Sequence, residues 1–356
     1  MKNFIVFGKP VIDQSEINEV LDTLNSGWLG TGPKVHLFEK DFAKFKNVNH
    51  ALALNSATAG LHLSCLALNL KPGDEVITTA MTFCATINII IHSGAKPVLV
   101  DIDPNTWNID VKKIESKISK KTKAIIPVHF AGRPCEMDYI LDISKKYNLK
   151  IIEDCAHAIE TEYKGIKAGT FGDYGVFSFY ATKNLAVGEG GMVITKTKKN
   201  ISRLKTLALH GMSKDAWGRF SDNGYKHYKV VEAGFKYNMP DLMASIGIHQ
   251  LKKIEKFSIR RKQIWDLYMN EFSGLNIKLP SNINAQNKHA YHLFNICINS
   301  HKSGISRDNF LSKMNQLGIG LGVHYESIPS HPYYNKKFGW NPDDFPNSYK
   351  FGSETV

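Results

Sequence analysis

The chain has 356 residues, of which 43% are hydrophobic and 22% are charged, and its formal net charge is +12 at pH 7. This composition is typical of a globular protein of two domains, and it excludes a membrane partner because no apolar stretch approaches the roughly 18 residues of a membrane span. The lysines are dispersed and not interleaved with aromatic residues, which favours solvated helix faces over a nucleic-acid surface. A milder consequence of the positive charge is attraction of a small polyanionic substrate.

The N-terminal segment, residues 1–45, opens with MKNFIVFGKP, whose apolar run is too short for a secretory signal, so we expect a soluble, cytoplasmic protein. Two amphipathic stretches follow, SEINEVLDTLNSG and HLFEKDFAKF, and they predict helices that pack beside a small C-terminal domain. Across the whole chain the five cysteines are scattered and the fourteen histidines lack metal-ligand spacing, so we expect neither a disulfide nor a metal site.

From residue 50 onward, short apolar runs alternate with helical patterns, which predicts an α/β fold class for a large domain over residues 46–240. The apolar runs are HALALN, DEVITT, KPVLVDID, KAIIPVHF and KIIEDC, and the helical patterns between them include VKKIESKI and MDYILDISKKY. We expect parallel βαβ units, because parallel strands need a crossover helix between them. After Gly172 two closely spaced strands are predicted, YGVFSFY and GGMVITK.

A period near 3.6 residues continues for many turns from about Met239 and predicts a bridging helix over residues 241–274. Beyond it, HLFNICIN, SRDNFLSKMNQLG and IGLGVHYE predict a small α/β domain over residues 275–356.

In open α/β sheets ligands bind at the carboxyl ends of the strands, so the residues that follow the apolar runs are the first candidates for a site. NSATAG follows the first run and opens a helix, whose free N–H groups at Ser56, Ala57 and Thr58 would cradle a phosphate. Taken alone, the same stretch is more typical of ordinary N-capping by Ser56 or Thr58.

The strand KIIEDCAHA ends in Glu153 and Asp154, and His157 follows three residues later. A carboxylate that leaves a buried strand needs a partner, which is either a helix N-terminus or a protonated pyridine nitrogen. His157, taken singly, is more typical of a structural histidine.

Lys183 lies between SFYAT and the glycine-rich GEGG. Burial among Phe177, Phe179 and Tyr180 would favour the neutral amine, the form that attacks aldehydes. A phosphate cradle, an acid at a strand end and a lysine in an apolar pocket are the three contacts that pyridoxal 5′-phosphate requires, for its phosphate, its ring nitrogen and its aldehyde. Phe83, in MTFCAT, would stack on the ring, although a core role fits it equally well.

Six separated motifs, in this order, resemble the nucleotide-sugar aminotransferases of the DegT/DnrJ/EryC1/StrS family, and the resemblance covers essentially the whole chain. The motifs are NSATAGLH, DEVITTAMTFCATINIIIHSGAKPVLVDID, IIPVHFAG, IIEDCAHA, SFYATKNLAVGEGGMVIT and GFKYNMPDLMASIGIHQL. The resemblance implies fold type I of the pyridoxal phosphate enzymes, with a mainly parallel seven-stranded sheet. It also implies a homodimer whose active sites lie at the subunit interface.

The resemblance assigns a role to each candidate residue. Lys183 matches the lysine that bonds to the cofactor's aldehyde, Asp154 matches the partner of its ring nitrogen, and His157 matches a contact of its ring oxygen. The stacking position is Phe83, which lacks the polar group of the tryptophan or tyrosine often found there; the phosphate contacts are Ala57, Thr58, Ser178 and, from the neighbouring subunit, Asn238. Taken alone, Asn238 is typical of a turn ahead of Pro240. Three candidates for the sugar pocket, for which structural roles fit about equally well, are His210, His324 and Tyr325.

The implied reaction moves an amino group from an amino acid, expected to be L-glutamate, to a nucleotide-linked keto sugar. The sequences of these motifs are most similar to those of relatives that act at C4 of a 4-keto-6-deoxyhexose or related sugar. Such relatives contribute to a surface polysaccharide such as an O-antigen. Amination at C3 or of a keto-inositol is the alternative, a non-catalytic nucleotide-sugar binding protein is a third possibility, and a family dehydratase would carry histidine in place of Lys183. Relatives of this family usually continue past the position of FGSETV with a strand and a closing helix, so either this sequence omits the tail or the small domain is shortened at its end.

Overall fold

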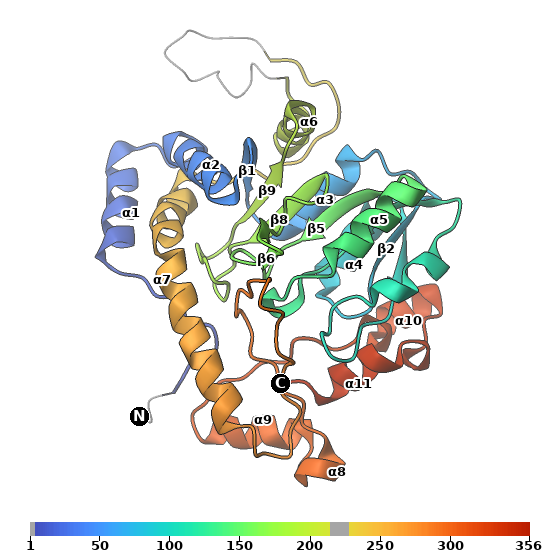
Figure 1. Cartoon of the computed structure of the whole chain (residues 1–356). Helices are drawn as coiled ribbons and strands as arrows, with labels where there is room; N and C mark the ends of the chain where they lie inside the picture. Colours follow the sequence, from blue (N-terminus) through green and yellow to red (C-terminus); the bar gives the residue numbers. More distant parts are fainter. Residues whose placement is uncertain (1–3, 214–227) are drawn as a thin grey trace.

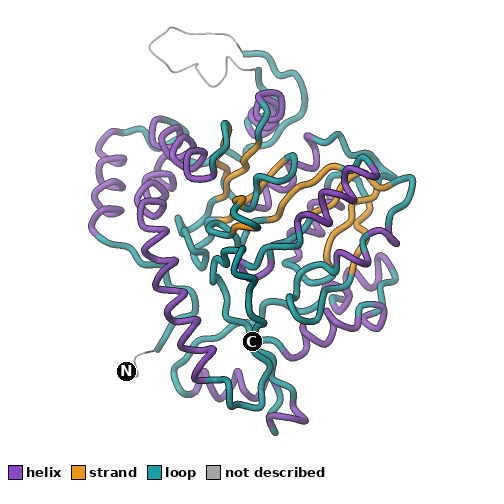
Figure 2. The backbone as a smooth tube through the Cα atoms, viewed as in Figure 1, coloured by secondary structure: helices purple, strands orange, loops and turns teal. Residues whose placement is uncertain are grey.

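A seven-stranded sheet forms the centre of the protein, and the computed structural model describes residues 4–213 and 228–356. The strand order is β1-β9-β8-β5-β4-β2-β3, and β9 alone runs in the direction opposite to that of the other six strands of this sheet. This arrangement confirms the predicted α/β fold class with its mainly parallel seven-stranded sheet. Figure 2 shows the strands in the middle of the molecule with helices around them. The strands are β1 (His50–Leu54), β2 (Glu75–Thr79), β3 (Lys96–Val100), β4 (Thr122–Ile126), β5 (Lys150–Asp154), β8 (Tyr174–Ser178) and β9 (Gly191–Thr195).

Helices cover both faces of the sheet (Figure 1). They are α2 (Pro33–Lys46), α3 (Ala57–Ala67), α4 (Cys84–His92), α5 (Met137–Tyr147), α6 (Lys198–Ala208) and α7 (Asp241–Glu271). Because side chains alternate along a strand, Val176 of β8 packs with α3 and α6, whereas its neighbour Phe177 packs with α2 and α7 on the opposite face. The helix α5 covers the latter face farther along the sheet.

The N-terminal segment forms the predicted pair of helices, α1 (Gln14–Ser26) and α2. A capping box of Asp13 and Glu16 begins α1, and Gly27, with φ of 71°, ends it. The expectation that this pair packs beside the C-terminal part is wrong, because both helices lie mainly along α7; ahead of them, Ile5 pairs with Ile319. The carboxylate of Asp241, the first residue of α7, accepts hydrogen bonds from backbone N–H groups at the N-terminus of α2 and so joins the two helices.

The C-terminal part contains short helices rather than regular strands. They are α8 (Ser300–Ser303), α9 (Arg307–Gln316), α10 (Pro332–Phe338) and α11 (Pro346–Glu354). In place of the strands expected in an α/β domain, the structure has isolated pairs, such as Lys278 with Cys297, which exchange two backbone hydrogen bonds. Tyr334 of α10 and Phe345 ahead of α11 pack against Leu99 of the large sheet. The domain boundaries at residues 46, 241 and 275 stay a prediction.

Two local features differ from the predicted pattern. The stretch VKKIESKI forms two 3₁₀ turns, Val111–Lys113 and Glu115–Lys117, instead of an α-helix. Val111 and Ile114, three residues apart as in such a turn, are buried in the core, and Ile118 packs against it. Along the chain, a small hairpin of β6 (Glu162–Tyr163) and β7 (Ile166–Lys167) comes between β5 and β8; it forms a separate two-stranded sheet. Among the described helices, none combines the length and apolar character needed to cross a bilayer.

Candidate active site

A cavity of about 310 Å³ opens at the carboxyl ends of β1, β2, β5 and β8. This is the edge of an open α/β sheet at which ligands bind. The cavity brings together most of the residues singled out in the sequence. Its lining includes Ser56, Ala57, Thr58, Phe83, Asp154, His157, Ser178, Lys183, His324 and Tyr325.

The N-terminus of α3 forms one wall of the cavity. Ser56 is the N-cap residue, and its hydroxyl accepts a hydrogen bond from the N–H of Ala59 at 3.1 Å, as the capping interpretation predicted. The amides of Ala57 and Thr58 remain at the open end of the helix, where the helix supplies no acceptor for them. A β-carbon at Gly191 would lie 2.4 Å from the backbone of Ser56, so this glycine lets β9 pass directly beneath the wall. Capping and anion binding are therefore compatible here.

Asp154 ends β5 and is buried at the base of the cavity. One of its carboxylate oxygens accepts from the hydroxyl of Thr86 at 2.8 Å and the other from the N–H of Ala156 at 3.1 Å. Burial raises the pKa of this carboxyl group, and the two hydrogen bonds and the charge of Lys183 only partly oppose that effect. Among the residues that the structure describes, the carboxylate has no ion-pair partner, and a protonated ring nitrogen would supply one.

Lys183 lies in the turn between β8 and β9, and its side chain reaches the same cavity as Asp154. Burial lowers the pKa of its ammonium group to about 8, and the nearby charge of Asp154 limits the shift. The residues expected to surround it are partly wrong: Phe177 and Phe179 belong to the core beneath α2 and α7, whereas Ser178 and Tyr180 face the cavity. The alternation of β8 explains this division.

His157 is held from both sides of its ring. The N–H of Ala131 donates to Nδ1 at 3.1 Å, and Nε2 lies 2.9 Å from the hydroxyl of Tyr325. Burial lowers the pKa of His157 well below its usual value, and the neighbouring Lys183, His292 and His324 add to the shift, so the imidazole is neutral.

Phe83 and His324 stand at the rim. Phe83 is 55% exposed, and its ring centre lies 5.6 Å from that of Tyr325. Burial lowers the pKa of His324 to about 4, so the imidazole of His324, like that of His157, lines the cavity in its neutral form.

Two predicted residues do not reach this cavity within the described part of the chain. Asn238 pairs with Leu54 of β1 and donates from its amide to the Thr31 hydroxyl at 2.6 Å, while its Oδ1 is buried without a described partner. His210 is exposed, with φ of 55°, and its backbone N–H donates to Phe235.

Sequence reasoning missed the residues that hold the site residues in place. The hydroxyl of Thr86 supports Asp154 and lies 2.9 Å from the hydroxyl of Thr82. Thr82 precedes α4 and Thr86 is in its first turn, so the two threonines of TFCAT were the available signal. Asn184 follows Lys183 and donates to Glu160 and to the carbonyl of Ala290, both at 2.9 Å. The contacts of Thr86 with Asp154 and of Asn184 with Glu160 and Ala290 join residues 24 to 106 positions apart, and no local pattern reports them.

A buried cluster beside the site resembles a set of metal ligands but is already satisfied. Ligand atoms of His129, Glu153 and Cys155 lie within 4.8 Å of one another. The Glu153 carboxylate accepts from three backbone N–H groups, those of Gly169, Phe171 and Gly172, and is hydrogen-bonded to His129 at 3.1 Å. Glu153 is therefore an anchor for the loop ahead of β8, whereas its neighbour Asp154 faces the cavity.

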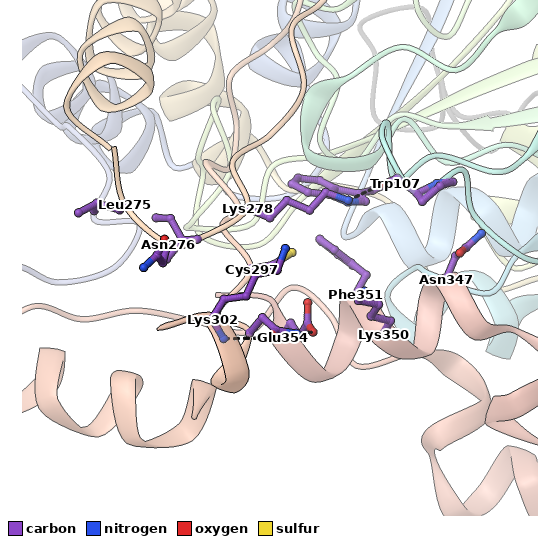
Figure 3. Close-up of a pocket in the computed structure, with 13 residues that line it drawn as sticks. Trp107, Leu275, Asn276, Lys278, Cys297, Lys302, Asn347, Lys350, Phe351 and Glu354 are labelled. Carbon is purple, nitrogen blue, oxygen red and sulfur yellow. Dashed lines mark hydrogen bonds between the residues drawn. The ribbon is translucent and has the colours of Figure 1, made fainter. Parts of the chain in front are cut away.

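A second cavity, of about 380 Å³, lies between Trp107, Lys278, Lys350 and Phe351 (Figure 3). Trp107 packs on Phe351 with ring centres 4.5 Å apart. None of the residues predicted for the site lines this cavity, so it does not belong to the site at the strand ends.

The fold and the cavity place the protein in a class of solved structures, the sugar aminotransferases. Spr1654 from Streptococcus pneumoniae, named as a sugar aminotransferase and solved in forms with PLP and PMP, is 35% identical in its PMP form, with a TM-score of 0.90 over 99% of this chain and 92% of that one. DesI, solved in the presence of its TDP-sugar product, is 28% identical, with a TM-score of 0.87 over 100% of this chain and 87% of that one. Among curated relatives, the spore coat polysaccharide biosynthesis protein SpsC from Bacillus subtilis is 44% identical over 355 residues, 99% of this chain and 91% of SpsC.

The chain belongs to the DegT/DnrJ/EryC1/StrS aminotransferase family, whose model matches residues 10–356. This finding confirms the resemblance seen in the motifs and, with it, the predicted enzyme class. Pyridoxal phosphate is confirmed as the cofactor at the level of the family, since its solved members include forms with PLP and PMP.

Proposed function

We propose that this protein uses pyridoxal 5′-phosphate to transfer an amino group from L-glutamate to C4 of a nucleotide-linked 4-keto-6-deoxyhexose or related sugar. The observation that carries the proposal is a single cavity that joins Lys183, Asp154 and the N-terminus of α3. These groups come from three distant parts of the chain. Their chemistry fits the aldehyde, the ring nitrogen and the phosphate of this cofactor in turn.

The residues of the cavity fit the cofactor for physical reasons visible in the structure. The amides of Ala57 and Thr58 and the hydroxyl of Ser178 offer donors for a phosphate, and Gly191 leaves room for the wall that presents them. Asp154 is a buried acid with a raised pKa, which a cationic ring nitrogen would stabilise as carboxylate. Phe83 offers an aromatic face at the rim.

The bound cofactor would supply an aldehyde and an electron-accepting ring. Lys183 would act first as the amine that holds the aldehyde and then, once released, as the general base that takes the proton from the α-carbon of the amino donor. With a pKa of about 8, its Nζ carries a usable neutral fraction near neutral pH and can return the proton. Asp154 would keep the ring nitrogen protonated, and the neutral His157 would add no competing charge.

The proposed acceptor follows from charge and from the relatives. A net charge of +12 suits a nucleoside diphosphate. DesI was solved with a TDP-sugar product, and SpsC is named for polysaccharide biosynthesis, so an amino sugar for a surface polysaccharide, made in the cytoplasm, is a consistent product. The neutral His324, at the rim of the cavity, is placed to contact the sugar.

We further propose that the protein is a homodimer with shared sites. Asn238 does not line its own chain's cavity yet has a buried amide oxygen without a described partner, as expected of a residue that serves the neighbouring site. At the rim, Phe83 is 55% and Tyr180 46% exposed, and Ile17, Leu21 and Leu24 on α1 are exposed by 45% to 51%. Aromatic and aliphatic surface of this kind is suited to contact with a second copy of the chain.

Reduction of the purified protein with borohydride tests the core of the proposal. The protein should be yellow, lose the colour on reduction, and carry the reduced cofactor on the peptide that contains Lys183. Lys183→Ala should abolish transamination, whereas Lys164→Ala, at a surface ion pair, should leave it unchanged. Substantial turnover by Lys183→Ala would contradict the role of Lys183. A colourless protein without transaminase activity would instead favour a non-catalytic nucleotide-sugar binding protein.

The position of amination needs a separate experiment. Turnover of 4-keto and 3-keto nucleotide sugars and of a keto-inositol should be compared with L-glutamate as donor, and the product identified by NMR. We expect the 4-keto sugar to react fastest. A preference for either of the other acceptors would overturn the C4 assignment and leave the enzyme class intact.

A further inference from the structure

The hydrogen bonds of His157 determine which of its nitrogens carries the proton. Ala131 donates its backbone N–H to Nδ1 at 3.1 Å, and a ring nitrogen that accepts from an N–H group carries no proton itself. Ala131 sits in a tight turn with φ of 54°, so this donor has a defined direction. A neutral imidazole has one proton, which must therefore be on Nε2.

The proton on Nε2 determines the orientation of Tyr325. The Nε2–H group of His157 donates to the phenolic oxygen of Tyr325, 2.9 Å away. The phenol must then direct its own proton elsewhere. Within residues 4–213 and 228–356, His157 is the one hydrogen-bond partner of the Tyr325 hydroxyl.

The direction left for this proton is the cavity. Tyr325 lines it, and the ring is packed between Phe83 and Phe130, with centres 5.6 Å and 6.2 Å away. The titratable groups that face the phenol are His157, His324, Cys84 and Asp154. Both oxygens of Asp154 already accept hydrogen bonds, from Thr86 and Ala156.

We propose that Tyr325, oriented by the chain of hydrogen bonds from Ala131 through His157, donates the hydrogen bond to the ring oxygen of the bound cofactor. This inference rests on the proposed function and changes the role of His157, which the family resemblance placed in direct contact with that oxygen. Here both ring nitrogens of His157 are engaged, so it is a positioning residue, and Tyr325 is the contact.

The covalent structure of the cofactor supports this placement. Its ring oxygen lies on the edge away from the phosphate arm, so the donor has to come from an element other than α3. A donor to this oxygen stabilises its anionic form and makes the nitrogen shared with Lys183 release its proton at lower pH. Removal of the donor should shift that proton loss to higher pH.

Spectrophotometric titration of the holoenzyme tests the proposal without an activity assay. The visible band of the bound cofactor reports the protonation of the nitrogen shared with Lys183, and Tyr325→Phe should raise its apparent pKa by about one unit while leaving the bound cofactor in place. Tyr334→Phe removes a hydroxyl that is bonded to Asn88 at 2.7 Å and to the carbonyl of Cys84 at 3.4 Å. Neither of these residues lines the cavity, so this variant should titrate as the wild type does.

A double-mutant comparison separates the roles of the two residues. His157→Asn is too short to join Ala131 to Tyr325, and it should shift the band in the same direction but add little to Tyr325→Phe, because both act through one contact. A shift with His157→Asn and none with Tyr325→Phe would overturn the proposal and return the contact to His157. Absence of any visible band in the wild type would instead overturn the proposed function, and this inference with it.

Discussion

Two buried lysines show how the same physical change serves different ends. Burial lowers the pKa of both Lys183 and Lys46 to about 8. Lys183 lines the cavity, whereas the ammonium group of Lys46 donates to the carbonyl of Ile159 at 3.2 Å and lies 4.6 Å from the centre of the Phe177 ring. A lowered lysine pKa alone therefore does not identify a catalytic amine; position in the cavity does.

Replacement of either lysine by methionine should stabilise the cofactor-free protein near pH 7, by about 1–3 kcal/mol. At this pH the lysine is charged in the folded and the unfolded chain, and burial of the charge destabilises only the folded one. The gain should shrink as the pH rises from about 8 to 10.5, because the folded protein loses the proton in this range while the unfolded chain keeps it.

Urea unfolding of the cofactor-free proteins at several pH values measures this effect. Lys46→Met serves as the matched control, since it should retain the cofactor that Lys183→Met loses. If the gain stayed constant with pH in both variants, the pKa of neither lysine would be lowered in the folded protein, and the prediction would be wrong.

At the scale of elements, the turn that carries Lys183 is tied to α7 by a buried polar chain. Arg261 of α7 forms an ion pair with Glu160, whose side chain is fully buried, and Glu160 accepts from Asn184. The amide nitrogen of Asn184 donates to Glu160 and to the carbonyl of Ala290, and its amide oxygen accepts from Nδ1 of His292 at 2.9 Å. These contacts hold the lysine's turn against a helix that begins far later in the sequence.

Arg261→Met should lower the free energy of unfolding by about 3–5 kcal/mol at neutral pH, because it leaves Glu160 buried and unpaired. The pKa of Glu160 is already raised by burial, which Arg261 opposes. Without Arg261 the pKa rises further, so the loss should be small near pH 4.5 and grow toward neutral pH. Arg260→Met, at an exposed neighbour on α7, is the control and should cost well under 1 kcal/mol; equal losses in the two variants would refute the tie.

At the scale of the whole molecule, shared sites predict complementation between two inactive variants. Lys183→Ala and Asn238→Ala should each be strongly impaired, whereas mixed dimers rebuild one intact site, with Lys183 from one subunit and Asn238 from the other. If subunits exchange freely, activity should recover to about a quarter of the wild type, because half the dimers are mixed and each has one complete site. Unchanged inactivity after proven exchange, or an active monomer in sedimentation, would contradict the shared site.

The sequence alone determined the fold class and the candidates for the site. Continuous apolar runs separated by helical periods are what a mainly parallel sheet requires, so β1 to β5 and their helices were predictable, as was the position of Asp154 at a strand end. The predictions differed from the structure at Lys278 and Cys297, which form an isolated pair and not regular strands, and at VKKIESKI, which forms 3₁₀ turns and not a helix. At both places, contacts made elsewhere in the chain decide the local structure.

Only the tertiary structure decided what surrounds each candidate. Strand alternation sends Phe177 and Phe179 away from Lys183, and it makes Glu153 an anchor while Asp154 faces the cavity. The protonation of His157 depends on an amide 26 residues away, and the direction of Tyr325 depends on His157, 168 residues away. Hydrogen bonds and burial of this kind act through space, so periodicity can indicate which residues form a site but not which atom donates to which.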